Sequence, residues 1–222
     1  MTQGSGRTPL IVAHRAGNHP ARVGPAVAAG ADVLELDVHL RRGRLEVRHP
    51  RRAGPLLWDR EGVALARPPL PGVADIAAAA GAAGLMLDLK DGPPALAAAA
   101  VAAARDGGPP REMIVVSRRW ALLDPVAGHA GVRTVLTAGS PCELAALRRR
   151  LARPPAPGGV CVRRSLLDPD LAAELAAAVP LVMTWPVISR SDARTLLEWG
   201  VTGLICDALA GVGALASSGP AR

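Results

Sequence analysis

A regular alternation of short apolar runs with longer Ala- and Leu-rich stretches constrains the fold more than any other feature of this chain. The apolar runs are bounded by Gly, Pro or charged residues, which is typical of β-strands. Most are almost continuously apolar, as parallel strands buried on both faces are. Eight strands are predicted in this way, at residues 10–15, 31–38, 85–90, 113–117, 132–136, 158–162, 181–185 and 203–207.

The stretches between the strands predict helices at residues 74–84, 95–107, 142–153, 170–179 and 191–200. Six of the seven spacings between strand starts are 19 to 28 residues long, and each fits one βα unit. The remaining spacing, 53 residues when the second strand is counted from Asp32, leaves room for an insertion that includes a short strand at 45–49. Eight units in 222 residues predict a (β/α)8 TIM barrel with an insertion between the second and third barrel strands, at about residues 41–84. A doubly wound sheet is the alternative.

The composition excludes a disordered chain and favours one core. Half of the residues are hydrophobic and the mean hydropathy is +0.23. Because Phe and Tyr are absent, the core volume must come from Leu, Val and Ala. A chain of 222 residues lies within the range of one large domain, so we expect a single domain over residues 1–222.

The net charge of +7 is a weak indication of a nucleic-acid partner, because 25 of the 26 Lys and Arg residues are Arg and the bias runs through the whole chain. No aromatic residues interleave with the Arg clusters at 41–52 and 148–153 to stack on bases. We therefore expect a small-molecule substrate and no nucleic acid. The sequence leaves the oligomeric state open.

Cysteine usage and the N-terminal sequence indicate the compartment. The three cysteines are widely spaced and form no CxxC pattern, which argues against a disulfide framework and a zinc site. The first residues lack the apolar segment of a signal peptide, and no run approaches the ~20 apolar residues of a membrane-spanning helix. These features predict a cytoplasmic protein that does not insert into a membrane.

Acidic residues recur near the ends of the second and third predicted strands, where a parallel barrel places its active site. Glu35 and Asp37 are two residues apart and share one face of a strand, and Asp88 lies on the next strand. Neighbouring carboxylates among apolar residues need a cation, and oxygen ligands suit a hard divalent ion such as Mg²⁺ or Ca²⁺. The alternative is that these acids pair with arginines at the barrel rim.

Basic residues at the same strand ends complete a candidate site. Lys90 is the only lysine, which indicates a need for a compact ammonium that contacts a phosphate oxygen or orients Asp88. His14 ends the first strand, and His49 in the insertion can face it across the site. A pair of histidines suits acid/base chemistry at neutral pH. His39, on the same strand face as Asp37, is a second-rank candidate.

Six motifs occur in order over nearly the whole chain: HRAGN at 14–18, GADVLELDVHL at 30–40, V-x-H at 47–49, LDLK at 87–90, TWPV at 184–187 and GVTGLICD at 200–207. Together they resemble the glycerophosphodiester phosphodiesterases, barrel enzymes that hydrolyse phosphodiesters with a metal ion. The resemblance implies cleavage of a glycerophosphodiester into glycerol 3-phosphate and an alcohol such as choline or ethanolamine. It also implies a role for each of these residues: His14 and His49 as acid/base pair, Glu35, Asp37 and Asp88 as metal ligands, Arg15 and Lys90 as phosphate contacts, and Trp185 in the pocket wall.

The sequence departs from the family pattern in three places. A Glu-Asn-Thr motif is missing from the first loop, and only 17 residues separate His14 from Asp32. The family's His-Asp pair is His49-Pro50 here, so the orientation of His49 must come from elsewhere. Asp88 stands where the family has Glu. Two alternatives therefore remain beside the phosphodiesterase: a catalytically silent barrel that binds a phosphorylated metabolite, and a related lysophospholipase D-type enzyme.

Overall fold

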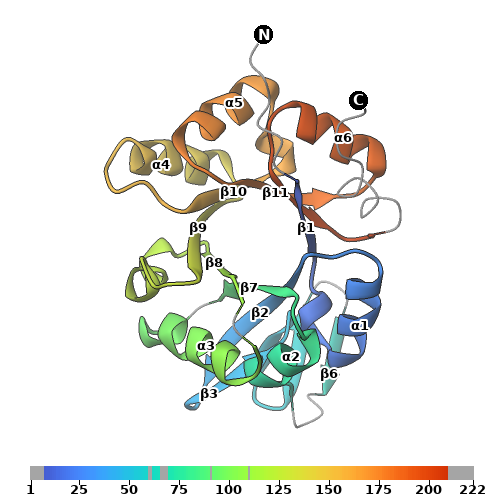
Figure 1. The fold of residues 1–222 in the computed structure, drawn as a ribbon. Coiled ribbons are helices and arrows are strands. Elements are labelled where there is room, and N and C mark those ends of the chain that lie inside the picture. Colours follow the sequence, from blue (N-terminus) through green and yellow to red (C-terminus); the bar gives the residue numbers. More distant parts are fainter. Residues whose placement is uncertain (1–7, 60–61, 66–69, 91, 110, 210–222) are drawn as a thin grey trace.

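The computed structural model describes residues 8–59, 62–65, 70–90, 92–109 and 111–209, and its centre is a closed parallel barrel (Figure 1). Neighbouring barrel strands pair in parallel, and β1 pairs with both β12 and β2, which closes the sheet. The predicted (β/α)8 TIM barrel is therefore confirmed, and the doubly wound sheet is excluded. The barrel strands are β1 (Leu10–Ala13), β2 (Val33–Arg41), β7 (Gly84–Leu89), β8 (Met113–Ser117), β9 (Val132–Ala138), β10 (Gly159–Arg163), β11 (Val182–Val187) and β12 (Gly203–Cys206).

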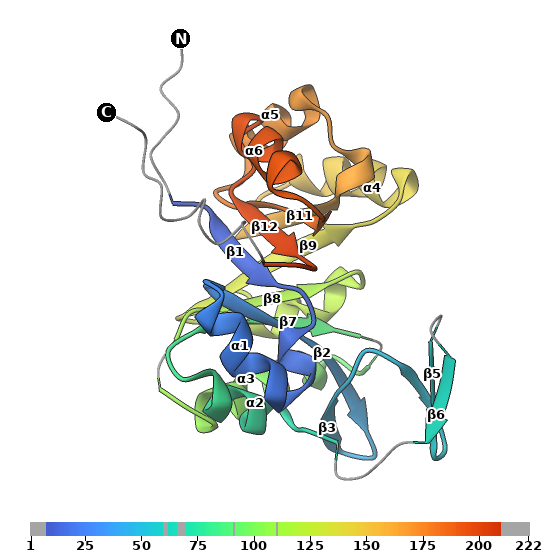
Figure 2. The same ribbon diagram turned by 90° about the vertical axis from the view of Figure 1, so that its right-hand side faces the viewer.

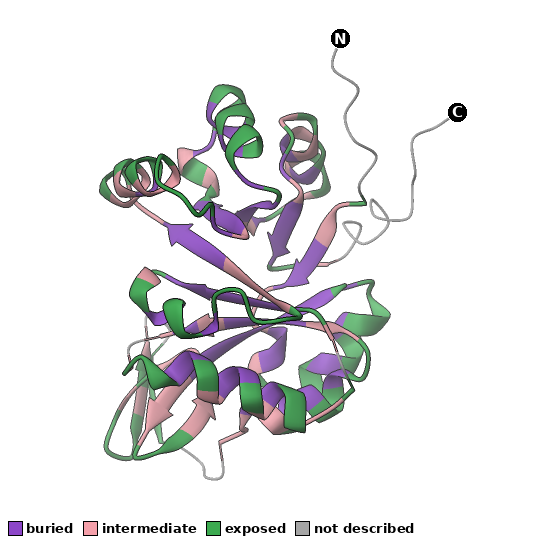
Figure 3. Cartoon of the chain, turned by 60° about the vertical axis from the view of Figure 1, so that its left-hand side comes forward, coloured by how far each residue is buried: buried purple, intermediate pink, exposed green. Residues whose placement is uncertain are grey.

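The barrel strands separate two layers of buried side chains because successive residues point to opposite faces. In β1, for example, Ile11 and Ala13 join the core beneath the helices, whereas Val12 belongs to the cluster inside the barrel. Figure 3 shows this arrangement, with buried strands at the centre and exposed residues on the outer turns of the helices. The inner cluster consists of Val12, Val33, Met86, Ile114, Val116, Val135, Cys161, Leu181, Met183 and Ile205.

The helices surround the barrel, and the described residues contain one more than the sequence predicted. They are α1 (Pro20–Ala28), α2 (Val73–Ala80), α3 (Ala95–Asp106), α4 (Pro141–Leu151), α5 (Pro169–Ala178) and α6 (Arg190–Glu198). The extra helix is α1, which contains Gly24 and Pro25, both poor helix formers. It starts with Pro20, and the His19 side chain accepts a hydrogen bond from the amide of Ala21 at 3.2 Å.

The connection between β8 and β9 departs from the regular βα repeat. In the described residues it contains two short 3₁₀ turns, Trp120–Leu122 and Asp124–Val126, instead of an α-helix. Leu122, Leu123 and Val126 are buried and fill the place of a helix in the outer core. This is the shortest of the strand spacings, 19 residues, which leaves little room for a full helix.

The insertion forms β-structure that extends from one side of the barrel (Figure 2). β3 (Arg44–Val47) pairs antiparallel with β2, so the strand predicted at 45–49 ends earlier and His49 follows it. A separate antiparallel sheet consists of β4 (Arg51–Ala53), β5 (Leu56–Asp59) and β6 (Gly62–Leu65). The predicted range of 41–84 is too long, because α2 packs between α1 and α3 in the helical layer of the barrel.

Among the described helices, none is both long enough and apolar enough to cross a membrane.

Candidate active site

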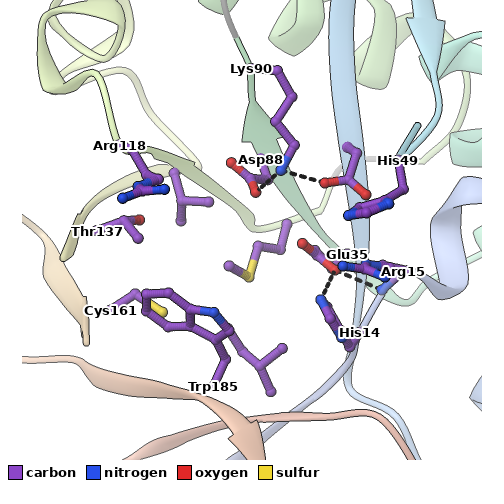
Figure 4. Close-up of a pocket in the computed structure, with 14 residues that line it drawn as sticks. His14, Arg15, Glu35, His49, Asp88, Lys90, Arg118, Thr137, Cys161 and Trp185 are labelled. Carbon is purple, nitrogen blue, oxygen red and sulfur yellow. Dashed lines mark hydrogen bonds and ion pairs between the residues drawn. The ribbon is translucent and has the colours of Figure 1, made fainter. Parts of the chain in front are cut away.

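A pocket of about 190 Å³ opens at the carboxyl ends of the barrel strands (Figure 4). The structure brings all of the sequence-predicted site residues into its lining: His14, Arg15, Glu35, Asp37, His49, Asp88, Lys90 and Trp185. His39, the second-rank candidate, does not line the pocket. Burial lowers the pKa of His39 to about 4, with Arg48 and Lys90 adding to this effect.

Three carboxylates converge at the floor of the pocket. Glu35 and Asp37 point into it from β2, and the parallel register places Asp88 of β7 opposite Asp37. One oxygen atom of each carboxylate lies within 4.8 Å of the others. Glu35 and Asp37 are buried, and the Asp88 side chain is 24% exposed. Three acids at this spacing and depth repel one another, so the cluster requires a compensating positive charge or a proton.

The pKa shifts of these acids show how the negative charge of the cluster is compensated. Burial, together with the charges of Asp37 and Asp88, raises the pKa of Glu35 to about 8. Burial also raises the pKa of Asp88. Burial acts in the same direction on Asp37, but Lys90 and a hydrogen bond from Asn18 outweigh it and lower the pKa of Asp37. Without a further cation, Glu35 therefore carries a proton at neutral pH.

Lys90 forms ion pairs with two of the three acids. Its ammonium nitrogen forms ion pairs with Asp37 and Asp88. Burial disfavours the charged lysine, but the two carboxylates raise the pKa of Lys90 and keep it protonated. The lysine contact with Asp88 matches one of the two roles that the sequence indicated for this residue.

The carboxylate cluster fits a divalent metal ion by the chemistry of its donors. All three side chains offer hard oxygen ligands, and their spacing allows one ion to contact all of them. A divalent ion can displace the proton from Glu35, because it balances the same negative charge. Glu35, Asp37 and Asp88 are thus the described residues that could hold Mg²⁺ or Ca²⁺.

The turn after β1 supplies a backbone amide and an Asn side chain that form hydrogen bonds with the acids. Arg15 has a φ of 55°, and this left-handed backbone points its amide to the Glu35 carboxylate at 2.6 Å. The Asn18 side chain donates to Asp37 at 2.5 Å and accepts from the Asp37 amide at 2.8 Å. The Nε atom of Arg15 is buried and finds no hydrogen-bond partner among the described residues.

The two histidines lie at different depths and contact different carboxylates. His14 Nδ1 is hydrogen-bonded to Asp207, and its Nε2 lies 3.6 Å from Glu35. The His14 side chain is 16% exposed. His49 is more open, at 34%, and its Nδ1 lies 3.5 Å from Asp59 Oδ2. One histidine therefore faces the acidic floor, and the other sits at the mouth.

The opposite wall contains groups that the sequence analysis did not select. Thr137 and Cys161 line the pocket from β9 and β10, and Arg118 lines it from the end of β8. Thr137 Oγ1 is buried without a hydrogen-bond partner in the described part of the chain. Arg118 forms an ion pair with Glu143 at 2.5 Å. Asp207 and Thr137 lie at or near the carboxyl ends of their strands. A search for polar residues at the carboxyl end of every predicted strand would therefore have found them.

Fold and site together define a (β/α)8-barrel protein with an acidic pocket at the carboxyl ends of its strands. No protein-family model matches the sequence. No curated protein matches it either. Similarity to known proteins is therefore visible at the level of solved structures.

The chain is similar in fold to several phosphodiesterase structures. One is a phosphodiesterase from Oleispira antarctica, solved in complex with the product sn-glycerol-3-phosphate; the TM-score is 0.74 at 17% identity, covering 95% of this chain and 98% of the other. A glycerophosphodiester phosphodiesterase from Parabacteroides distasonis gives a TM-score of 0.69 at 17% identity, covering 96% and 98%. The enzyme from Thermotoga maritima gives 0.66 at 15% identity, covering 92% and 97%. The shared fold extends over nearly the whole chain.

Proposed function

We propose that this protein is a metal-dependent phosphodiesterase that cleaves glycerophosphodiesters into glycerol 3-phosphate and an alcohol. The observation that carries the proposal is the convergence of three carboxylates, one lysine and two histidines in a single pocket. The fold similarity to solved glycerophosphodiester phosphodiesterases supports it. The proposal includes a single domain over residues 1–222, a cytoplasmic location and a role in lipid metabolism.

Glu35, Asp37 and Asp88 would hold the divalent ion, either Mg²⁺ or Ca²⁺. When bound, such an ion neutralises phosphate charge and stabilises the charge that develops in the transition state. Arg15 and Lys90 add positive charge from this chain. Arg15 and Lys90 both line the pocket, where their cationic side chains can bind the oxygens of the substrate phosphate.

His14 would act as the base. Its Nδ1–H donates to Asp207, which leaves Nε2 as an acceptor on the side of the acidic floor. It can take the proton from water as the water oxygen attacks phosphorus. If the glycerol hydroxyl adjacent to the phosphate attacks instead, the alcohol departs to leave a cyclic phosphate, which water must then open to give glycerol 3-phosphate. In both routes the bond from phosphorus to the departing alcohol breaks. His49, at the mouth, can give a proton to the oxygen that leaves.

A lysophospholipase D-type activity is a second candidate, favoured by one observation. Leu56 and Trp58 of β5 pair with Leu65 and Val63 of β6, so all four share one sheet face, and all four are exposed. Such a face, on the sheet that also carries Asp59 close to His49, can contact an acyl chain. The catalytic constellation would be the same for both substrates. The silent, phosphate-binding barrel would bind substrate without turnover.

Release of glycerol 3-phosphate tests the proposal directly. Purified protein is incubated with glycerophosphocholine, glycerophosphoethanolamine or lysophosphatidylcholine, each with Mg²⁺, Ca²⁺, Mn²⁺ or a chelator. We expect chelator-sensitive release that is lost in His14→Ala. From the lysophospholipid a lysophospholipase D-type enzyme would release choline and leave lysophosphatidic acid, so choline release from this substrate alone would select the second candidate. Folded protein that binds glycerol 3-phosphate but turns over none of these substrates would contradict the enzymatic proposal.

A further inference from the structure

The small sheet of the insertion has a second face, which is turned to the site. Successive residues of β5 point to opposite faces, so Leu57 and Asp59 lie on the side opposite Trp58. Asp59 is 19% exposed, and its Oδ2 lies 3.5 Å from His49 Nδ1. On the other face, the Arg51 guanidinium stacks over Trp58 at 5.2 Å from the ring centre. This stacking and the strand pairing fix which way the Asp59 carboxylate points.

The residues adjacent to His49 in the chain do not supply an acidic partner. Pro50 has no ionisable side chain, and Arg48 is a cation that bonds to the Pro50 carbonyl and, at 3.0 Å, to Glu46. His49 itself follows β3 in a bend outside regular structure. Its ring orientation is therefore set by contacts from elsewhere in the fold, and Asp59, ten positions further along the chain, provides one.

Further contacts hold the sheet beside β3. The Arg52 guanidinium pairs with Glu46 at 2.5 Å and also donates to the carbonyl of Gly54 at 3.1 Å. Arg41, at the end of β2, reaches the same carbonyl at 3.4 Å. These contacts connect the sheet to the barrel extension that precedes His49. The position of Asp59 relative to His49 is thus defined by the insertion as a whole.

We propose that Asp59 is a positioning residue for His49: it accepts the Nδ1–H and holds Nε2 toward the leaving oxygen. This inference rests on the proposed function. It gives each histidine its own carboxylate from a separate element, Asp207 for His14 and Asp59 for His49. A carboxylate that accepts a hydrogen bond from one ring N–H of a histidine fixes the tautomer and stabilises the imidazolium. The insertion is then part of the active site.

The test compares Asp59→Asn and Asp59→Glu with Glu112→Gln as the matched control. Glu112 is an acid that pairs with Arg133 at 2.8 Å outside the active-site pocket. Two substrates are used, glycerophosphocholine and a glycerophospho-nitrophenyl ester, whose leaving group needs little protonation. For Asp59→Asn we expect kcat on glycerophosphocholine to fall about 10- to 100-fold with KM nearly unchanged. The kcat of Asp59→Asn on the nitrophenyl ester should fall much less. Asp59→Glu should recover part of the kcat on glycerophosphocholine.

A second measurement does not depend on turnover. Nitrogen NMR of the histidine rings, assigned with His49→Asn, reports which ring nitrogen of His49 carries the proton. In the wild type we expect Nδ1 to carry a proton both in the neutral ring and in the imidazolium that donates from Nε2, whereas the neutral ring in Asp59→Asn should be a mixture of the two tautomers. Equal losses of kcat on both substrates, or an unchanged His49 tautomer, would overturn the inference. A changed tautomer in a protein without any turnover would uphold the positioning contact and reject the proposed function.

Discussion

The two walls of the pocket differ in charge, and under the proposed function this difference would separate the chemistry from the recognition of the alcohol. The wall formed by β1, β2 and β7 carries the histidine, the acids and the lysine. The wall formed by β9, β10 and β11 presents Thr137, Cys161 and Trp185, which are uncharged; burial raises the pKa of Cys161 well above its ordinary value. Changes on the first wall should alter kcat, and changes on the second should alter substrate preference.

The largest effect is expected from neutralising an acid of the charged wall. Glu35→Gln or Asp37→Asn should lower kcat by about a hundred- to a thousand-fold, because each removes a ligand charge where transition-state charge develops. Turnover with Mg²⁺ and circular dichroism of each variant measure this. The fold should persist, since the apolar core is untouched. Retained activity in both variants would remove these residues as metal ligands.

A smaller loss is expected when the single lysine is changed to arginine. In Lys90→Arg the larger, planar guanidinium cannot occupy the position of the ammonium between Asp37 and Asp88, and kcat should fall by roughly ten-fold. Arg133→Lys, at an arginine that pairs with Glu112 outside the active-site pocket, is the control and should stay close to wild type. If Lys90→Arg has wild-type kinetics, the lone lysine is a result of composition.

The charged wall also predicts a pH dependence of stability in metal-free protein. The pKa of Glu35 is raised from 4.5 to about 8, so between these values the folded state keeps a proton that the unfolded chain has released. Stability contributed by this group is therefore present below its unfolded pKa and is lost as pH rises through about 8. Calorimetry in chelator should show Tm falling from about pH 5 to about pH 8.

Two comparisons sharpen this result. Glu35→Gln should flatten the fall in Tm over the same pH range, because Gln does not titrate. Mg²⁺ should raise Tm more at high pH than at low pH, since it competes with the proton for the acids. A pH dependence identical in Glu35→Gln would assign the titration to another group.

The smallest effects are expected on the uncharged wall. Trp185→Ala should raise KM several-fold with little change in kcat, and the factor should depend on the alcohol. Thr137→Val removes a buried hydroxyl that has no partner in the described chain, so it should leave Tm unchanged or raise it slightly. Steady-state kinetics on several glycerophosphodiesters measure the first effect, and calorimetry measures the second. A kcat loss in Trp185→Ala as large as that in Lys90→Arg would contradict the prediction that the uncharged wall affects substrate preference and not kcat.

Much of the fold was predictable because the strands are apolar runs with clear boundaries. The candidate site was predictable for a related reason: His14, Glu35, Asp37 and Asp88 interrupt or end these runs, where a barrel exposes side chains to its mouth. Helix α1 was missed because its Gly and Pro residues lower helix propensity, while burial of Val23 and Ala26 against the core stabilises it.

The sequence by itself determined the alternation of strands and helices, and with it the barrel and the edge at which the polar residues meet. Only the tertiary structure decided the partners of the histidines. Asp207 reaches His14 from the far end of the chain because β12 pairs with β1. Asp59 reaches His49 because a separate sheet folds back beside β3. Periodicity records which face a residue takes along its own element, whereas contacts between elements depend on closure and packing of the whole chain.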